Sequence, residues 1–112
     1  MSRRRICVLS VVNMYVVADR VFRTKKELRS YCSLLLQTRP LGVCLEGEDK
    51  VFLLDLLSNH PRFSVKKGGG IAGVFIGEVL GWGTRNFFIE RCDGSVDNWS
   101  IQKCVTGVKT VL

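Results

Sequence analysis

Residues 66–104 have the sequence KKGGGIAGVFIGEVLGWGTRNFFIERCDGSVDNWSIQKC, and this stretch decides the fold that we predict. Its first part alternates glycines with bulky apolar residues, which is the period of a strand. Strands are predicted from Ile71 to Leu80 and from Arg85 to Arg91. Asp93-Gly94 is a strong turn signal, and a third short strand is expected from Val96 to Ser100. The stretch therefore predicts a small, mainly antiparallel sheet.

Two helices are predicted before this sheet. Thr24-Lys25-Lys26-Glu27 forms a capping box, and apolar residues spaced i, i+3, i+4 and i+7 follow it until Pro40. A second helix is expected to begin near residues 46–49, whose acidic side chains suit the positive end of the helix dipole, and to end at Asn59-His60-Pro61. The predicted class is α+β, with two helices packed on one face of the sheet. A strand at residues 15–17 is expected to join that sheet.

Length, composition and net charge narrow the range of possible functions. The chain has 112 residues, enough for one domain with a modest core, and 46% of them are apolar, which excludes global disorder. Seventeen Lys and Arg residues against ten Asp and Glu residues give a formal net charge of +7. Such a small basic domain attracts polyanions, of which nucleic acid is the commonest. The competing interpretation is that the charge only maintains solubility.

The five cysteines show no close spacing that is typical of a zinc ribbon or a redox motif, and their number is odd. We therefore expect small, buried, apolar thiols in a reducing compartment, either the cytoplasm or another intracellular space. They are Cys7, Cys32, Cys44, Cys92 and Cys104.

The first thirteen residues place Arg3-Arg4-Arg5 before an apolar run, as a signal peptide does. That run is broken at Asn13, rich in β-branched residues and too short to span a membrane. We therefore predict a leader or strand at residues 1–13, a single folded domain at residues 14–112, and no membrane partner.

The glycine run Gly68–Gly73 formally matches the dinucleotide-binding fingerprint. That site needs a strand before the glycines and a helix after them, whereas a strand is predicted to follow here, so no cofactor is expected. Two interpretations stay open. The glycines form a loop that approaches a phosphate beside Lys66 and Lys67, or they permit a tight entry into the strand.

Catalysis is not indicated. His60 is the only histidine, which excludes metal sites built on paired imidazoles, and no cluster of Asp, Glu and Cys replaces them. A cysteine nucleophile would need His60 beside Cys92 or Cys104. The favoured interpretation places His60 at the end of the second helix, where its ring interacts with the last carbonyls. We predict neither an enzyme nor a metal site.

Basic and aromatic residues suggest a binding surface instead. Strand alternation puts Arg85, Phe87, Ile89 and Arg91 on one face. Basic side chains neutralise phosphates and exposed aromatic rings stack on unpaired bases. Of Phe87, Phe88 and Trp99, however, at least two are expected in the core. The predicted nucleic-acid-binding residues are Lys66, Lys67, Trp82, Arg85, Arg91 and Lys103.

An ordered series of motifs from residue 22 to residue 105 resembles the DCL (defective chloroplasts and leaves) domain family. The motif residues include His60, Pro61, Gly68, Gly70, Asp93, Gly94, Trp99, Ser100 and Cys104. The family usually has Asp-Phe-Ser-aromatic where this chain has Asn98-Trp99-Ser100-Ile101, so the carboxylate role at that turn passes to Asp97 or is lost.

The resemblance implies a non-catalytic accessory module associated with ribosomal RNA maturation or transcription, which binds RNA in preference to DNA. The alternative is an adaptor that docks on a protein partner such as a polymerase or a ribosome-assembly factor. We expect a monomer, or a weak dimer formed through an exposed sheet edge.

Overall fold

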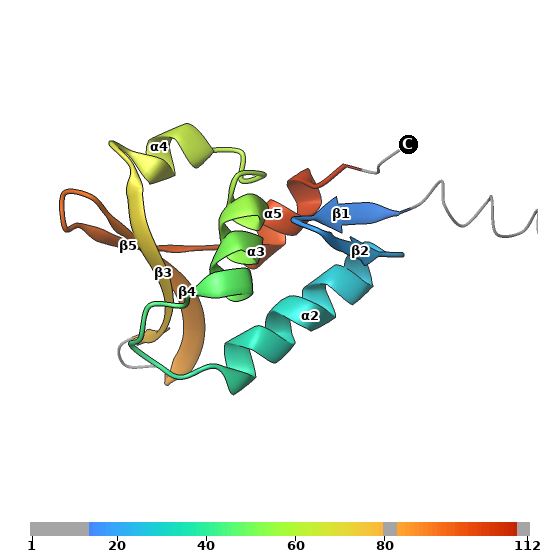
Figure 1. The fold of residues 1–112 in the computed structure, drawn as a ribbon, viewed down its shortest axis with the longest axis horizontal. Helices are drawn as coiled ribbons and strands as arrows, with labels where there is room; N and C mark the ends of the chain where they lie inside the picture. The colour runs from blue at the N-terminus through green and yellow to red at the C-terminus, as the bar shows by residue number, and fades with distance from the viewer. Residues whose placement is uncertain (1–13, 80–82, 110–112) are drawn as a thin grey trace, which may run out of the picture.

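The computed structural model describes residues 14–79 and 83–109 and confirms the predicted α+β class (Figure 1). The main sheet lies against the helices, and a separate hairpin lies beyond them. In chain order the elements are β1 (Tyr15–Val17), β2 (Arg20–Phe22), α2 (Lys25–Thr38), α3 (Gly47–Leu57), α4 (Phe63–Lys67), β3 (Ile71–Val79), β4 (Thr84–Arg91), β5 (Val96–Trp99) and α5 (Ile101–Gly107).

The main sheet has the antiparallel strand order β3-β4-β5, so the three predicted strands are confirmed to within about one residue. The segment before α3 covers the outer edge of β3: the Gly42 and Leu45 backbone amides each donate to a β3 carbonyl at 2.8 Å, on Ile76 and Val74. Strand β5 forms the opposite edge of the sheet.

The predicted place of the N-terminal strand is wrong. Strand β1 pairs with β2 in a two-stranded antiparallel sheet of its own, in which Tyr15 lies opposite Phe22. The chain reverses after Val17 through Ala18, whose φ is +54°. A hairpin this tight leaves β1 no length to reach the main sheet.

Helix α2 begins as its capping box predicts. The Thr24 hydroxyl accepts a hydrogen bond from the Glu27 amide at 3.1 Å, and the Glu27 carboxylate accepts one from the Arg23 amide at 2.8 Å. Helix α3 begins within the predicted residues 46–49, with acidic Glu48 and Asp49 in its first turn, and ends at Leu57, two residues before the predicted end at Asn59. Side-chain capping therefore fixes the start of α2, whereas acidic side chains near the positive end of the dipole favour the start of α3.

Two helices were not predicted. Helix α4 has five residues, and α5 lies after β5, where no element was predicted. The Ser100 hydroxyl caps α5 by accepting from the Lys103 amide at 3.3 Å. Such short helices carry too few turns to show a hydrophobic period. Among the described residues, no helix is long and apolar enough to cross a bilayer.

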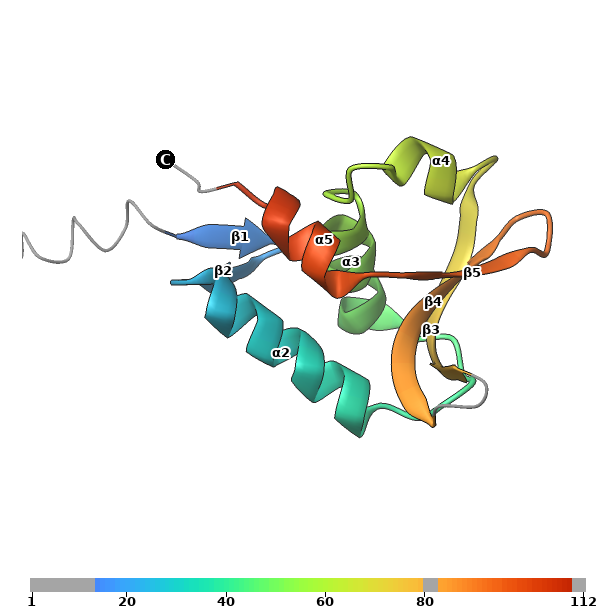
Figure 2. The same cartoon turned by 180° about the vertical axis from the view of Figure 1, so that it is seen from behind.

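The core lies where the helices cover one face of the main sheet. Helix α2 contacts β4 and α3 contacts β3 (Figure 2). Phe87 is fully buried and stacks on the equally buried Trp99, with 5.3 Å between the ring centroids. The core role considered for these two aromatics is confirmed. The strand residues of this face are Val74, Ile76, Phe87, Ile89 and Trp99.

The cysteines do not all behave as predicted. Cys32 and Cys104 are buried, and burial raises the pKa of each thiol to about 12. Cys44 and Cys92 are exposed, so the expectation of burial is wrong for them. Both lie beside glycines at the sheet's margin, where no side chain covers them: the Cys44 sulfur is near Gly73 and that of Cys92 is near Gly70.

These environments predict two classes of thiol reactivity. Maleimide at neutral pH should label Cys44 and Cys92 in the native protein within minutes, because the thiolate is the reacting species and these thiols are accessible. Cys32 and Cys104 should react only in denaturant. Mass spectrometry of the digested protein distinguishes the two classes, and fast native labelling of Cys104 would contradict the packing of α5.

Candidate functional site

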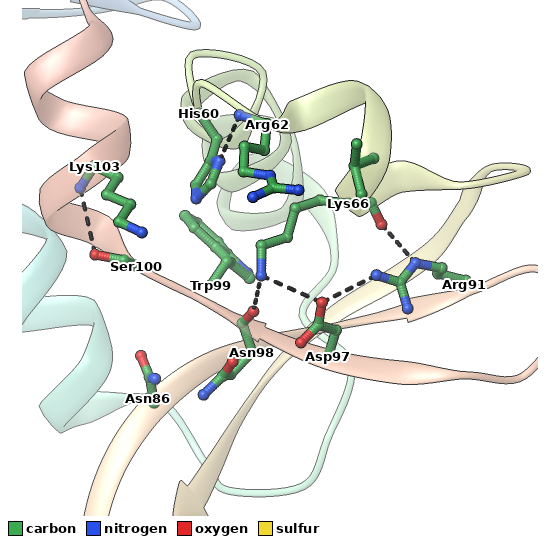
Figure 3. A pocket seen from close by; sticks show the side chains of 11 residues that line it. His60, Arg62, Lys66, Asn86, Arg91, Asp97, Asn98, Trp99, Ser100 and Lys103 are labelled. Atoms are coloured by element: carbon green, nitrogen blue, oxygen red, sulfur yellow. Dashed lines mark hydrogen bonds and ion pairs between the residues drawn. The ribbon is translucent and has the colours of Figure 1, made fainter.

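An open pocket of about 410 Å³ lies where α4, β5 and α5 meet (Figure 3). Its side chains come from the loop before α4, from α4, from the sheet and from the start of α5. The lining residues are His60, Arg62, Val65, Lys66, Asn86, Arg91, Asp97, Asn98, Trp99, Ser100 and Lys103. Six of them are residues that the sequence marked: His60, Lys66, Arg91, Trp99, Ser100 and Lys103.

The Asp97 carboxylate pairs with two residues that were predicted to bind phosphate. Asp97 accepts from the Lys66 ammonium at 3.2 Å and from the Arg91 guanidinium at 3.0 Å (Figure 3). Burial acts to raise the pKa of Asp97, but the hydrogen bonds from Lys66 and Arg91 outweigh it and lower that pKa overall. Lys66 also donates to the Asn98 carbonyl at 2.9 Å, and Arg91 donates to the Lys66 carbonyl. Both cations therefore join α4 to the sheet.

Two other cations at the pocket are unpaired. Arg62 and Lys103 are both exposed, and neither side chain forms an ion pair or a hydrogen bond with any residue that the structure describes. The lining therefore has four cations, two of them free, and a single carboxylate. This arrangement leaves an excess of positive charge that an anion can neutralise.

His60 lies in the pocket wall, only 5% exposed. Its Nδ1 accepts a hydrogen bond from the Arg62 amide at 3.0 Å, and this contact replaces the predicted interaction with the last helix carbonyls. Burial, and then the positive charges of Lys66, Lys103 and Arg62, lower the pKa of His60 against an opposing effect of Asp97. The ring is therefore neutral at pH 7, with its proton on Nε2.

The Trp99 indole is a second buried donor, beside the Nε2–H of His60. The residue is 1% exposed, and its indole Nε1 is buried without a hydrogen-bond partner among the described residues. A buried N–H without a partner costs about 1–3 kcal/mol. Such a cost is commonly associated with a functional role or a bound group.

Several predicted ligands lie outside the pocket lining. Arg85 donates through Nη1 to the Leu36 and Arg39 carbonyls at 3.0 Å each, so it satisfies the C-terminal end of α2. Lys67 is exposed, with its ammonium 5.6 Å from the Phe63 ring centroid. Trp82, the predicted stacking residue, lies outside the described residues.

The glycine run connects α4 to β3. Gly68 follows α4 at a φ of +53°, and Gly70 precedes β3 at a φ of +139°, both in the region that favours glycine. A helix precedes the run and a strand follows it, the reverse of the dinucleotide-binding order. The geometry matches the interpretation of a tight entry into the strand.

The remaining motif residues have structural positions. Asp93 accepts from the Ser95 amide at 2.9 Å within the β4–β5 turn, where Gly94 has a φ of +89°. Pro61 is exposed between α3 and α4, and Cys104 is buried on α5. Within residues 14–79 and 83–109, no group of three His, Cys, Asp or Glu side chains could hold a metal ion.

Sequence reasoning missed four polar residues of the pocket: Arg62, Asn86, Asp97 and Asn98. Arg62 directly follows the motif residues His60-Pro61, and that adjacency was an available signal. Asp97 was considered only as a replacement for the carboxylate that the DCL family has at this turn. Its role depends on Lys66, which lies 31 positions away in the sequence.

The pKa shift of His60 predicts a pH effect on stability. Below about pH 6.5 an unfolded histidine takes up a proton that the folded His60 resists. The free energy of unfolding should therefore decrease as the pH falls from about 7 to about 5.5. His60→Asn, which keeps an acceptor for the Arg62 amide, should show a smaller decrease. Urea unfolding of both proteins at both pH values measures these decreases. Identical decreases in the wild type and in His60→Asn would contradict the lowered pKa of His60.

The comparisons with known proteins agree with this fold. A family model described as "Protein of unknown function (DUF3223)" matches residues 33–105. The solution NMR structure of an uncharacterized protein from Rhodospirillum rubrum is similar, with 28% identity and a TM-score of 0.72 over 80% of this chain and 85% of that chain. A search of curated proteins finds no match. The chain belongs to the DUF3223 family of proteins of unknown function.

Proposed function

We propose that this protein is a non-catalytic module that binds single-stranded RNA through its phosphates at the pocket between α4, β5 and α5. The observation that carries the proposal is the pair of unpaired cations, Arg62 and Lys103, on a lining with four cations and one carboxylate. Phosphate oxygens are the acceptors that such a surface favours.

The roles of the basic residues differ in this proposal. Arg62 and Lys103 contact phosphates directly, because their charged groups are exposed and free. Lys66 and Arg91 raise the local potential while they hold α4 against the sheet. Lys67 extends the basic surface along α4, and Trp82 remains the proposed stacking residue. Arg85 has its main role at the end of α2.

The resemblance to the DCL domain would place this binding in ribosomal RNA maturation or transcription. Backbone contacts carry no base identity, so little sequence specificity is expected. The proposed ligand is RNA in preference to DNA, because the resemblance points to RNA, whereas the cations alone would accept either polymer.

Fluorescence anisotropy with a labelled single-stranded RNA tests this proposal. Wild type is compared with Arg62→Gln/Lys103→Gln and with the control Lys26→Gln/Arg29→Gln, which removes one lysine and one arginine from exposed positions on α2. Affinity should fall as salt rises, and the pocket variant should bind more weakly. Its slope of log affinity against log salt should be smaller by about 1.4, since each phosphate contact contributes about 0.7.

The control Lys26→Gln/Arg29→Gln distinguishes a loss of affinity at the pocket from a general effect of charge. Both double variants lower the net charge by two, so a general charge effect would weaken both equally. Equal loss would place binding away from the pocket. If wild type binds neither RNA nor DNA at low salt, the proposal is wrong and the alternative of a protein partner becomes the better account.

A further inference from the structure

We propose that the pocket recognises a terminal phosphate monoester at the end of an RNA strand in preference to an internal phosphodiester. This inference rests on the proposed function and adds to it the chemical group that the pocket receives.

The balance of charge favours a monoester. Arg62, Lys66, Arg91 and Lys103 face the pocket with Asp97 as the single carboxylate, and Asp97 is already paired with two of these cations. A phosphate monoester carries a charge of about −1.5 to −2 at pH 7, as phosphorylated side chains do. An internal diester carries one negative charge. The two free cations, Arg62 and Lys103, therefore match the charge of a terminal phosphate.

The size of the pocket and the placement of its lining side chains suit a single terminal nucleotide. Figure 3 shows Lys103 on the α5 side, Arg62 and Lys66 on the side of α4, and Asp97 and Asn98 on β5 between them. The volume of about 410 Å³ is within the range of pockets that hold small ligands, so one nucleotide can enter.

The buried polar groups of the wall are donors. His60 uses Nδ1 to accept from the Arg62 amide, so its Nε2 carries the ring proton. The Trp99 indole Nε1–H has no partner among the described residues and is buried. A terminal phosphate presents three free oxygens, all acceptors, whereas an internal diester presents two. The exposed donors of Arg62 and Lys103 therefore find one more acceptor oxygen on the monoester than on the diester.

Three otherwise identical short RNAs test the inference: one with a 5′-phosphate, one with a 3′-phosphate and one with hydroxyl groups at both ends. Binding is measured for wild type, for Arg62→Gln/Lys103→Gln and for the control Lys26→Gln/Arg29→Gln. Wild type should bind one phosphorylated RNA about tenfold or more tightly than the unphosphorylated one. The pocket variant should lose this preference, and the control should keep it.

The possible failures are distinguishable. If wild type binds all three RNAs equally, the inference is overturned while the proposed function stands. If it binds none of them, both are overturned. A phosphoserine peptide is included as a competitor. If that peptide displaces the phosphorylated RNA as well as free 5′-phosphorylated RNA does, the assignment to a nucleic-acid end is overturned.

Discussion

Trp99→Ala is expected to lower the free energy of unfolding by about 3–5 kcal/mol. Trp99 is among the largest fully buried side chains, and it stacks on Phe87 in the layer between the sheet and the helices. Truncation leaves a cavity that neighbouring groups on α5 and β4 fill only in part. Urea unfolding followed by circular dichroism measures the loss.

Trp99→Phe is the matched control for this truncation. It keeps a ring against Phe87 and removes the indole N–H that has no partner among the described residues. Removing an unsatisfied donor offsets part of the lost packing, so we expect Trp99→Phe to lose less than half as much stability as Trp99→Ala. If the two variants lose the same amount, the indole N–H is satisfied in solution and the description of the pocket wall is wrong.

Gly107→Ala is expected to destabilise the protein by about 2–3 kcal/mol or more, although alanine is ordinarily the better helix former by about 1 kcal/mol. A Cβ at this last residue of α5 would overlap the Asn59 backbone carbonyl oxygen. A backbone atom cannot move aside as the end of a side chain can. The close approach of α5 to the end of α3 therefore requires glycine, and thermal or urea unfolding measures the cost.

Gly69→Ala is the control for this substitution. No heavy atom lies within 4 Å of a Cβ built at Gly69, and its backbone φ lies outside the region that favours glycine. The change in its free energy of unfolding should stay within about 0.5 kcal/mol. A Gly107→Ala variant as stable as Gly69→Ala would contradict the packing of α5 against the end of α3.

The elements that the sequence predicted are those with local signals. The capping box at Thr24 and Glu27 forms as expected, and the Asp93-Gly94 turn lies between β4 and β5. Helices α4 and α5 were missed because each is too short to show a period. The partner of β1 was missed because it depends on the Ala18 turn, whose φ of +54° is unusual for a residue other than glycine.

Six of the eleven pocket residues were marked from the sequence, but their assembly into one site was not. Alternation correctly placed Arg85 and Arg91 on the face of Phe87 and Ile89, yet it could not show that helices cover that face. Both arginines donate hydrogen bonds to backbone carbonyls on that face, so their main role is to stabilise the fold. Arg62 was missed although it follows the motif residues His60-Pro61, because only tertiary structure shows that it shares the pocket with Lys103.

The central claim is that the pocket between α4, β5 and α5 binds the phosphates of RNA. Titration of the ¹⁵N-labelled protein with a 5′-phosphorylated single-stranded RNA at low salt tests it most directly. The account predicts that the amide shifts concentrate in residues 60–67 and 96–103 and that the Trp99 indole resonance moves with them. Shifts concentrated on α2 and the β1–β2 hairpin, with an unmoved Trp99 resonance, would contradict it.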